Sequence, residues 1–220
     1  MVSDTGQTRI AARATVRCVK DEVALLQAWK AGDRAAGDAL LAPIVPAIRR
    51  FFRNKVATEV DELTQQVVLD CVRNLQSFEG RSSFRTYALA VARRRLIAFY
   101  RQRGQTPGVD IDQLSIAEMA ESPSSVRARK QEHVFLLQAL REVPLELQVV
   151  LELHYWEALS TLEISEVLEI PQGTVKSRLR RAREAVAGRL RSLDPRGERV
   201  DDMVARFDEW AESLRELMDR

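Results

Sequence analysis

Apolar residues recur every three to four positions along most of this chain, which is the spacing of helices that bury one face. In the first half this pattern predicts helices at residues 21–30, 38–56, 60–75 and 83–103. In the second half it predicts helices at residues 126–142, 145–156, 160–168 and 172–193. Ala31-Gly32-Asp33 is expected to end one helix and start the next. The pattern therefore predicts an all-α protein.

Breaks in the helical pattern predict how the chain is divided. GQTPGVDID and ESPSS bound a stretch rich in turn-forming residues. We expect two small helical domains joined by a flexible linker, followed by a C-terminal amphipathic helix. The predicted parts are a flexible N-terminal extension (1–20), a first domain (21–103), an acidic linker (104–125), a second domain (126–193) and the C-terminal acidic helix (194–220).

The segment EIPQGTVKSRLRRAR, residues 169–183, combines an apolar face with an arginine-rich one. The apolar face consists of Val175, Leu179, Ala182 and Val186. The residues that point away from it are Lys176, Ser177, Arg180, Arg181 and Glu184, with Arg178 and Arg183 at its flanks. Just upstream, Ser160 and Glu163 have the spacing of a capping box at the start of a short helix. Together these features predict a helix-turn-helix that presents its second helix to a DNA major groove. The alternative is an ordinary surface helix with solvated arginines.

The net charge of +2 hides a strong segregation of charge along the chain. Residues 49–103 carry twelve basic and five acidic side chains, whereas residues 104–126 carry four acidic side chains and no basic one. The basic helix follows, and the C-terminal segment is again acidic. Two basic blocks separated by an acidic stretch indicate two separate contacts with a polyanion.

Aromatic residues alternate with arginines in the first basic block. The rings are Phe78, Phe84, Tyr87, Phe99 and Tyr100, and the arginines are Arg81, Arg85, Arg93, Arg94, Arg95 and Arg101. Single-stranded nucleic acid binds to such a mixture, because bases stack on rings while basic groups hold the backbone. The small residues of the EGRSS loop also suit a pocket for an extruded base. Packing of the rings in the hydrophobic core is an equal alternative for each of them.

Two long segments resemble bacterial RNA polymerase sigma factors of the extracytoplasmic-function (ECF) type. They are EVDELTQQVVLDCVRNLQSFEGRSSFRTYALAVARRR in the first domain and ALREVPLELQVVLELHYWEALSTLEISEVLEIPQGTVKSRLRRARE in the second. The resemblance implies a factor that binds core RNA polymerase and directs it to promoters. This family usually has Trp at the position of Tyr87, Asn near Arg94 and Asp near Ala98.

The resemblance also implies a role for each group of residues. The polymerase clamp would be bound by Asp61, Glu62, Leu63, Gln65 and Gln66. The −10 element would be opened and held by Phe78, Arg81, Ser82, Ser83, Phe84, Tyr87, Arg93, Arg94 and Arg95. The −35 duplex would be read by Gly173, Thr174, Lys176, Ser177, Arg178, Arg180, Arg181 and Arg183. An anti-sigma factor is a further expected type of partner.

Other classes of function find little support in the sequence. Cys18 and Cys71 are far apart, and neither His133 nor His154 has metal-ligand spacing around it. No Gly-rich phosphate loop, nucleophile–base pair or membrane-length apolar run is present, so we expect a cytoplasmic protein without cofactor, metal or enzymatic activity. A conventional helix-turn-helix regulator that is not a polymerase subunit remains the alternative.

Overall fold

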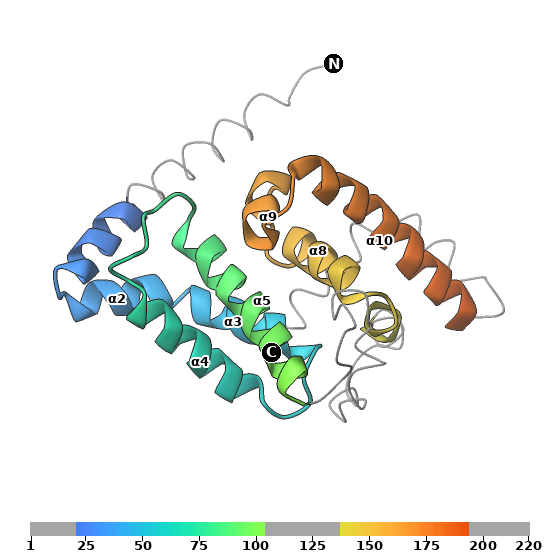
Figure 1. Ribbon diagram of the computed structural model, residues 1–220, viewed down its shortest axis with the longest axis horizontal. Coiled ribbons are helices and arrows are strands. Elements are labelled where there is room, and N and C mark those ends of the chain that lie inside the picture. The colour runs from blue at the N-terminus through green and yellow to red at the C-terminus, as the bar shows by residue number, and fades with distance from the viewer. Residues whose placement is uncertain (1–20, 104–136, 194–220) are drawn as a thin grey trace, which may run out of the picture.

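The computed structural model describes residues 21–103 and 137–193, and every regular element in these two ranges is helical. The first group comprises residues 21–30, α2 (Arg34–Leu41), α3 (Ile44–Arg53), α4 (Val60–Arg73) and α5 (Phe84–Gln102). The second comprises residues 137–141, α8 (Leu145–Tyr155), α9 (Thr161–Leu168) and α10 (Gln172–Leu193). The two groups lie side by side in Figure 1. The predicted N-terminal extension, linker and C-terminal helix lie outside the described residues, as do residues 126–136.

Local sequence signals set most of the helix ends. Gly32 adopts a φ of 103°, which favours glycine, and the Asp33 side chain then accepts backbone N–H bonds at the start of α2. Ser83 caps α5 by accepting from the Thr86 N–H. Ser160 and Glu163 form the predicted capping box of α9. The prediction of one helix over residues 38–56 is wrong, because α2 ends at Leu41 and Pro43, which has no N–H to continue the ladder, precedes α3.

The hydrophobic core runs through both domains. In the first domain it is centred on Ile48, Phe52, Val67, Phe84, Leu89 and Leu96, all fully or almost fully buried. In the second it is centred on Leu145, Leu153, Ile164, Val175 and Val186. These residues belong to one continuous buried cluster, and α9 packs directly on α5. The two domains are therefore in contact, although their sequences predict separate cores.

Candidate nucleic-acid interface

Helix α10 presents the basic face that its sequence predicts. Val175, Ala182 and Val186 are fully buried and Leu179 is nearly so, which anchors the helix on α8 and α9. The opposite side chains, Lys176, Ser177, Arg180, Arg181 and Glu184, are all exposed. Gly173 and Thr174 lie in its first turn, and the Pro171 carbonyl accepts from the Thr174 and Val175 N–H groups. An exposed basic helix on a rigid support is the geometry that major-groove reading requires.

Acidic neighbours hold several arginines of α10. The buried carboxylate of Glu146 on α8 lies 2.6 Å from Arg178 Nη2 and 3.9 Å from Arg181 Nη2. Arg180 pairs with Glu184 one turn away, at 3.1 Å. Arg183 lies over the Tyr155 ring, 5.5 Å from its centroid. Arg178 is therefore turned toward the supporting helix, while Arg181 extends from the same acidic anchor into solvent, with 56% of its side chain exposed.

Two of the aromatic residues predicted to bind the −10 strand lie in the core instead. Phe84 is fully buried and Phe78 is 8% exposed. Their rings pack edge to face at 5.5 Å, and Phe84 also packs on Trp29 at 5.7 Å. Both rings are covered by core packing in this structure, and their contact with the −10 strand stays a prediction. Tyr87 packs on both rings but is only half-buried.

The polar residues of the loop before α5 have local roles. Arg81 is exposed and lies 2.5 Å from Glu79. Ser83 is the helix cap, and its hydroxyl also bonds to the Thr86 hydroxyl at 2.8 Å. The Ser82 hydroxyl donates to the Ser83 carbonyl at 3.4 Å. Both serines are half-buried, so the loop is shaped by its own hydrogen bonds around Phe78 and Phe84.

A pocket of about 530 Å³ lies between α4 and α5, beside Tyr87. Its lining residues are Asp70, Asn74, Ser77, Tyr87, Val91, Arg94, Arg95 and Ala98. Arg95 is fixed by two bonds to the Asp70 carboxylate, one of 2.6 Å from Nη2 to Oδ1. Arg94 is half-exposed at the pocket, and Arg93 is half-buried outside it. Burial raises the pKa of Tyr87 above its ordinary value of 10.0.

The sequence did not identify Asp70, Asn74 and Ser77 as part of this site. They come from the end of α4 and the turn after it, whereas Tyr87, Arg94 and Arg95 come from α5. Asp70 and Arg95 are 25 residues apart, so no periodicity within one helix could have paired them. Tyr87, Arg94 and Ala98, which lie at or near three of the positions where this chain differs from the family pattern, all line the pocket.

Helix α4 has an exposed face of mixed character. Asp61, Glu62 and Gln65 are exposed and Gln66 is half-buried, as expected for a docking surface. Leu63 is only 4% exposed because it packs in the core, and its contact with a partner stays a prediction. Leu69 and Val72 are each 44% exposed and lie on the same side of the helix as Glu62 and Gln65. The helical spacing contained this signal, but Leu69 and Val72 were not among the residues selected from the sequence.

Other kinds of site are absent from the part of the chain that the structure describes. Residues 21–103 and 137–193 contain no group of three or more His, Cys, Asp or Glu side chains able to hold a metal ion. Within the same ranges no helix is both long and apolar enough to cross a bilayer. His154 instead contacts the Leu159 carbonyl through Nδ1 at 3.2 Å, so its ring has a hydrogen-bond partner.

Comparison with protein families identifies both domains. The family described as "Sigma-70 region 2" matches residues 38–106, and the family described as "Sigma-70, region 4" matches residues 136–186. The RNA polymerase sigma-H factor of Pseudomonas aeruginosa is 30% identical over 186 residues, covering 77% of this chain and 93% of that protein. This chain belongs to the sigma-70 family, among the ECF sigma factors. The ECF RNA polymerase sigma-E factor of Escherichia coli K12 is 29% identical, covering 77% of this chain and 94% of that protein.

Two solved structures share the fold. CnrH in complex with the cytosolic domain of CnrY superposes with a TM-score of 0.56 at 18% identity, covering 78% of this chain and 98% of that one. The sigma factor RpoE of Bartonella quintana, in complex with the anti-sigma factor NepR, has a TM-score of 0.53 at 21% identity, with 69% and 94% coverage. The family assignment confirms the predicted all-α, two-domain fold and the function of a sigma factor that directs RNA polymerase to promoters, and it does not favour the conventional regulator.

Proposed function

We propose that this sigma factor divides its promoter contacts between the pocket face of α5, which holds the unpaired −10 strand, and the basic face of α10, which reads the −35 duplex. Helix α4 docks on core RNA polymerase. The observation that carries this division is the difference between the two basic surfaces. One is a convex helix face, and the other surrounds a hollow with a ring at its edge.

The pocket suits a base that has left the duplex. Its volume of about 530 Å³ exceeds that of a single base, and a half-buried Tyr87 ring offers a stacking surface. Asn74 and Ser77 can hydrogen-bond a base edge, and Arg94 supplies charge for a neighbouring phosphate. Two bonds to Asp70 fix the orientation of the Arg95 guanidinium. Any further hydrogen bond that Arg95 donates therefore has a set direction.

The face of α10 suits an intact duplex. A bidentate contact from Arg181 or Arg180 to guanine contributes about 1–3 kcal/mol of discrimination. Glu146 Oε1 lies 3.9 Å from Nη2 of the Arg181 guanidinium, and this attraction restrains the side chain and lowers the entropy that it loses on binding. Lys176 and Ser177 lie one turn nearer the helix start, where side chains contact base edges in helix-turn-helix proteins.

The exposed face of α4 suits a protein surface instead of DNA. Asp61 and Glu62 would repel phosphates, whereas Leu69 and Val72 add apolar area at the centre of the same face. Reversal of both acids to Lys should abolish association with core polymerase while the fold is retained. The pair Asp21→Lys and Asp38→Lys reverses the same charge at two exposed acids outside α4 and is the matched control. Normal core binding by the Asp61→Lys/Glu62→Lys variant would show that the docking face lies elsewhere.

The factor itself has no catalytic step in this proposal, because the polymerase supplies the chemistry and the sigma factor supplies position. An anti-sigma factor is a second expected partner, since the B. quintana RpoE was solved with one. The cytoplasm, where polymerase and promoter DNA are found, is the proposed compartment.

Run-off transcription with core polymerase on a library of promoters tests the division of roles. Arg181→Ala should change the preferred bases in the −35 region alone, and Tyr87→Ala should change those in the −10 region alone. Glu166→Gln, an exposed substitution on α9, serves as the control. The division would be refuted if Tyr87→Ala altered the −35 preference or if neither variant altered any preference.

A further inference from the structure

The first helix (residues 21–30) binds both ends of the EGRSS loop that precedes α5, and it lies beside this loop in Figure 1. At the start of the loop, Lys30 Nζ donates to the Phe78 carbonyl at 2.6 Å. At its end, the Phe84 N–H donates to Glu22 Oε1 at 2.6 Å. Both bonds are partly buried, and they join residues 48 and 62 positions apart in the sequence. The loop is therefore held between two bonds from a single helix.

A third bond fixes the turn that carries Ser77. Gln76 Nε2 donates to the Lys30 carbonyl at 3.1 Å. Lys30 thus accepts from the residue before Ser77 through its backbone, and it donates to the residue after Ser77 through its side chain. Ser77 lines the pocket between α4 and α5, together with Tyr87. The position of this pocket residue is therefore set by bonds on both sides of it.

An aromatic ring fixes the first helix on the rest of the domain. Trp29 packs edge to face on Phe84, with 5.7 Å between the ring centroids. A Cβ atom at Gly37 of α2 would lie 2.5–2.7 Å from three atoms of the Trp29 indole, so only glycine leaves room for the ring there. A helix of this length is marginal in water on its own, and these contacts stabilise it. The polar bonds to the loop therefore start from a fixed support.

Interactions inside the EGRSS loop are local. Gly80 has a φ of 72°, in the region that favours glycine, and Arg81 pairs with Glu79 at 2.5 Å. Such interactions bend the loop but do not set its orientation relative to the pocket. Burial of the Phe78 and Phe84 rings places the two ends of the loop, and the bonds from the first helix orient the peptide groups at those ends.

We infer that Lys30 and Glu22 are positioning residues that set the base preference of the pocket between α4 and α5. Neither residue lines the pocket, and neither was among the residues predicted to bind DNA. Hydrogen bonds weaken steeply as their angle departs from linear, so a small rotation of the Ser77 peptide changes which base edge this residue can recognise. The inference rests on the proposed role of the pocket in holding an unpaired base of the −10 strand.

The test is run-off transcription with core polymerase on a promoter library whose −10 region is randomised. Lys30→Met and Glu22→Met each remove the polar end of a side chain and keep its approximate length, and Gln27→Met is the matched control at an exposed residue of the same helix. The position read by the pocket is the one whose base preference Tyr87→Ala alters.

At that position we expect the ratio between the best and the second-best base to fall about threefold to tenfold in Lys30→Met and in Glu22→Met, in line with the loss of one hydrogen bond. Gln27→Met should change this ratio by less than about twofold. Lys30→Arg keeps a donor at the end of a long side chain and should retain the preference.

Base preference separates positioning from stability. Loss of folded protein lowers transcription from every promoter of the library in the same proportion, so it leaves the ratio unchanged. The inference is overturned if both Met variants at Lys30 and Glu22 keep the ratio of the unmodified chain, or if Gln27→Met lowers it equally. If Tyr87→Ala alters the −10 preference and these two variants do not, only the positioning role is wrong. If Tyr87→Ala alters no −10 position, the role of the pocket is wrong, and the positioning role falls with it.

Discussion

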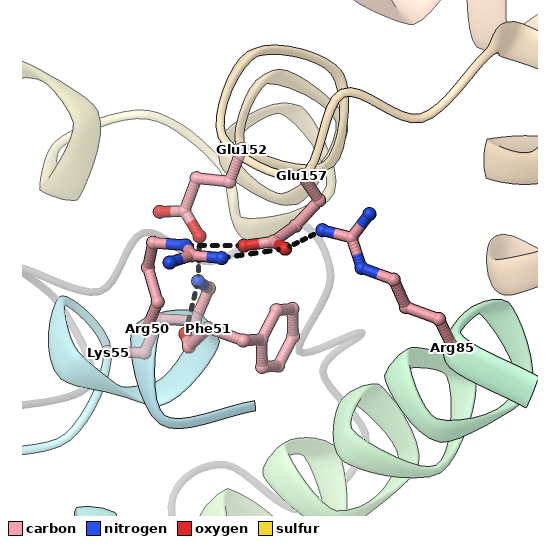
Figure 2. Close-up of polar contacts among 6 residues, drawn as sticks. All are labelled: Arg50, Phe51, Lys55, Arg85, Glu152 and Glu157. Carbon is pink, nitrogen blue, oxygen red and sulfur yellow. Dashed lines mark hydrogen bonds and ion pairs between the residues drawn. The ribbon is translucent and has the colours of Figure 1, made fainter. Parts of the chain in front are cut away.

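Replacement of Lys55 by Met should open the chain by separating its two domains. The Lys55 side chain is fully buried, and its ammonium binds Glu152 of α8 (Figure 2), which also accepts from Gln148 Nε2 at 2.7 Å. Burial lowers the pKa of Lys55 and raises the pKa of Glu152, while the attraction between the two charges opposes both shifts. Met has nearly the same length and packs against apolar surface, so the substitution removes the charge with little loss of volume.

The size of the effect follows from the position of the two charges. Removal of one partner from a buried ion pair costs about 3–5 kcal/mol, because the other charge stays buried and unpaired. Glu152 and Lys55 lie on different domains, however, so separation of the domains would return Glu152 to water. The measured cost is therefore limited by the free energy that holds the domains together. If docking is weaker than about 3–5 kcal/mol, Lys55→Met produces an open, folded chain instead of an unfolded one.

A double-mutant cycle distinguishes opening of the chain from a general loss of packing. Lys55→Met/Glu152→Leu removes both charges, and replacement of a buried pair by apolar groups is often neutral or stabilising. We expect the double variant to recover a compact shape, with a coupling energy of about 2–3 kcal/mol between the two sites. Lys176→Met, the same change at an exposed lysine, is the control.

Small-angle scattering measures the shape of these variants, and urea denaturation measures their stability. The reasoning is refuted if Lys55→Met keeps both the radius of gyration and the urea midpoint of the unmodified chain. It is also refuted if the double variant is no more compact than the single one.

Three further predictions concern the DNA-reading helix, a helix cap and the buried cysteine. Arg181→Ala should weaken binding of the holoenzyme to a −35 duplex by about 1–3 kcal/mol if the contact is to a base edge, and an unchanged affinity and base preference would remove Arg181 from the reading face. Ser160→Ala should lower the free energy of unfolding by about 0.5–2 kcal/mol, because it removes the capping box, and urea midpoints equal to those of Ser165→Ala would contradict this. Burial raises the pKa of Cys71 to about 12 from its ordinary value of 9.0, so the unfolded chain loses the thiol proton first and the free energy of unfolding falls as pH rises from about 9 toward 12. Urea denaturation across this range should show a smaller fall for Cys71→Ala, and identical pH profiles would count against burial of the thiol.

The helix-turn-helix could be predicted from sequence because its signals are local. The buried face of α10 repeats every three to four residues, and the capping box lies within four residues at the start of α9. Both depend only on neighbours along the same helix, where spacing determines position. The break between α2 and α3 was missed for the opposite reason. The apolar pattern continues through Pro43, a residue that has no N–H to continue the helix.

The contacts between the domains could not be predicted from sequence. Lys55 and Glu152 are 97 residues apart, and Arg50 and Glu157 are 107 apart. Each of these charges alone is typical of a solvated helix surface, because charged residues are almost never fully buried unless they are paired. The identity of the aromatic core residues was similarly undecided, since burial of Phe84 depends on Trp29 and Phe78 from other elements.

The junction between the domains, formed by Lys55–Glu152 and Arg50–Glu157, suits a closed form that can open. The hydrophobic cluster is continuous between the domains, so their separation exposes some apolar surface. The arginine, lysine and glutamate side chains of the junction are well hydrated once separated, which makes this part of the contact compatible with an open form in water. In the closed form, desolvation offsets most of the attraction within Lys55–Glu152 and Arg50–Glu157, which makes the contact specific without making it very strong. A partner that binds only the open form then needs a differential affinity of only a few kcal/mol to shift the population, within the range that a polymerase and a promoter together can supply.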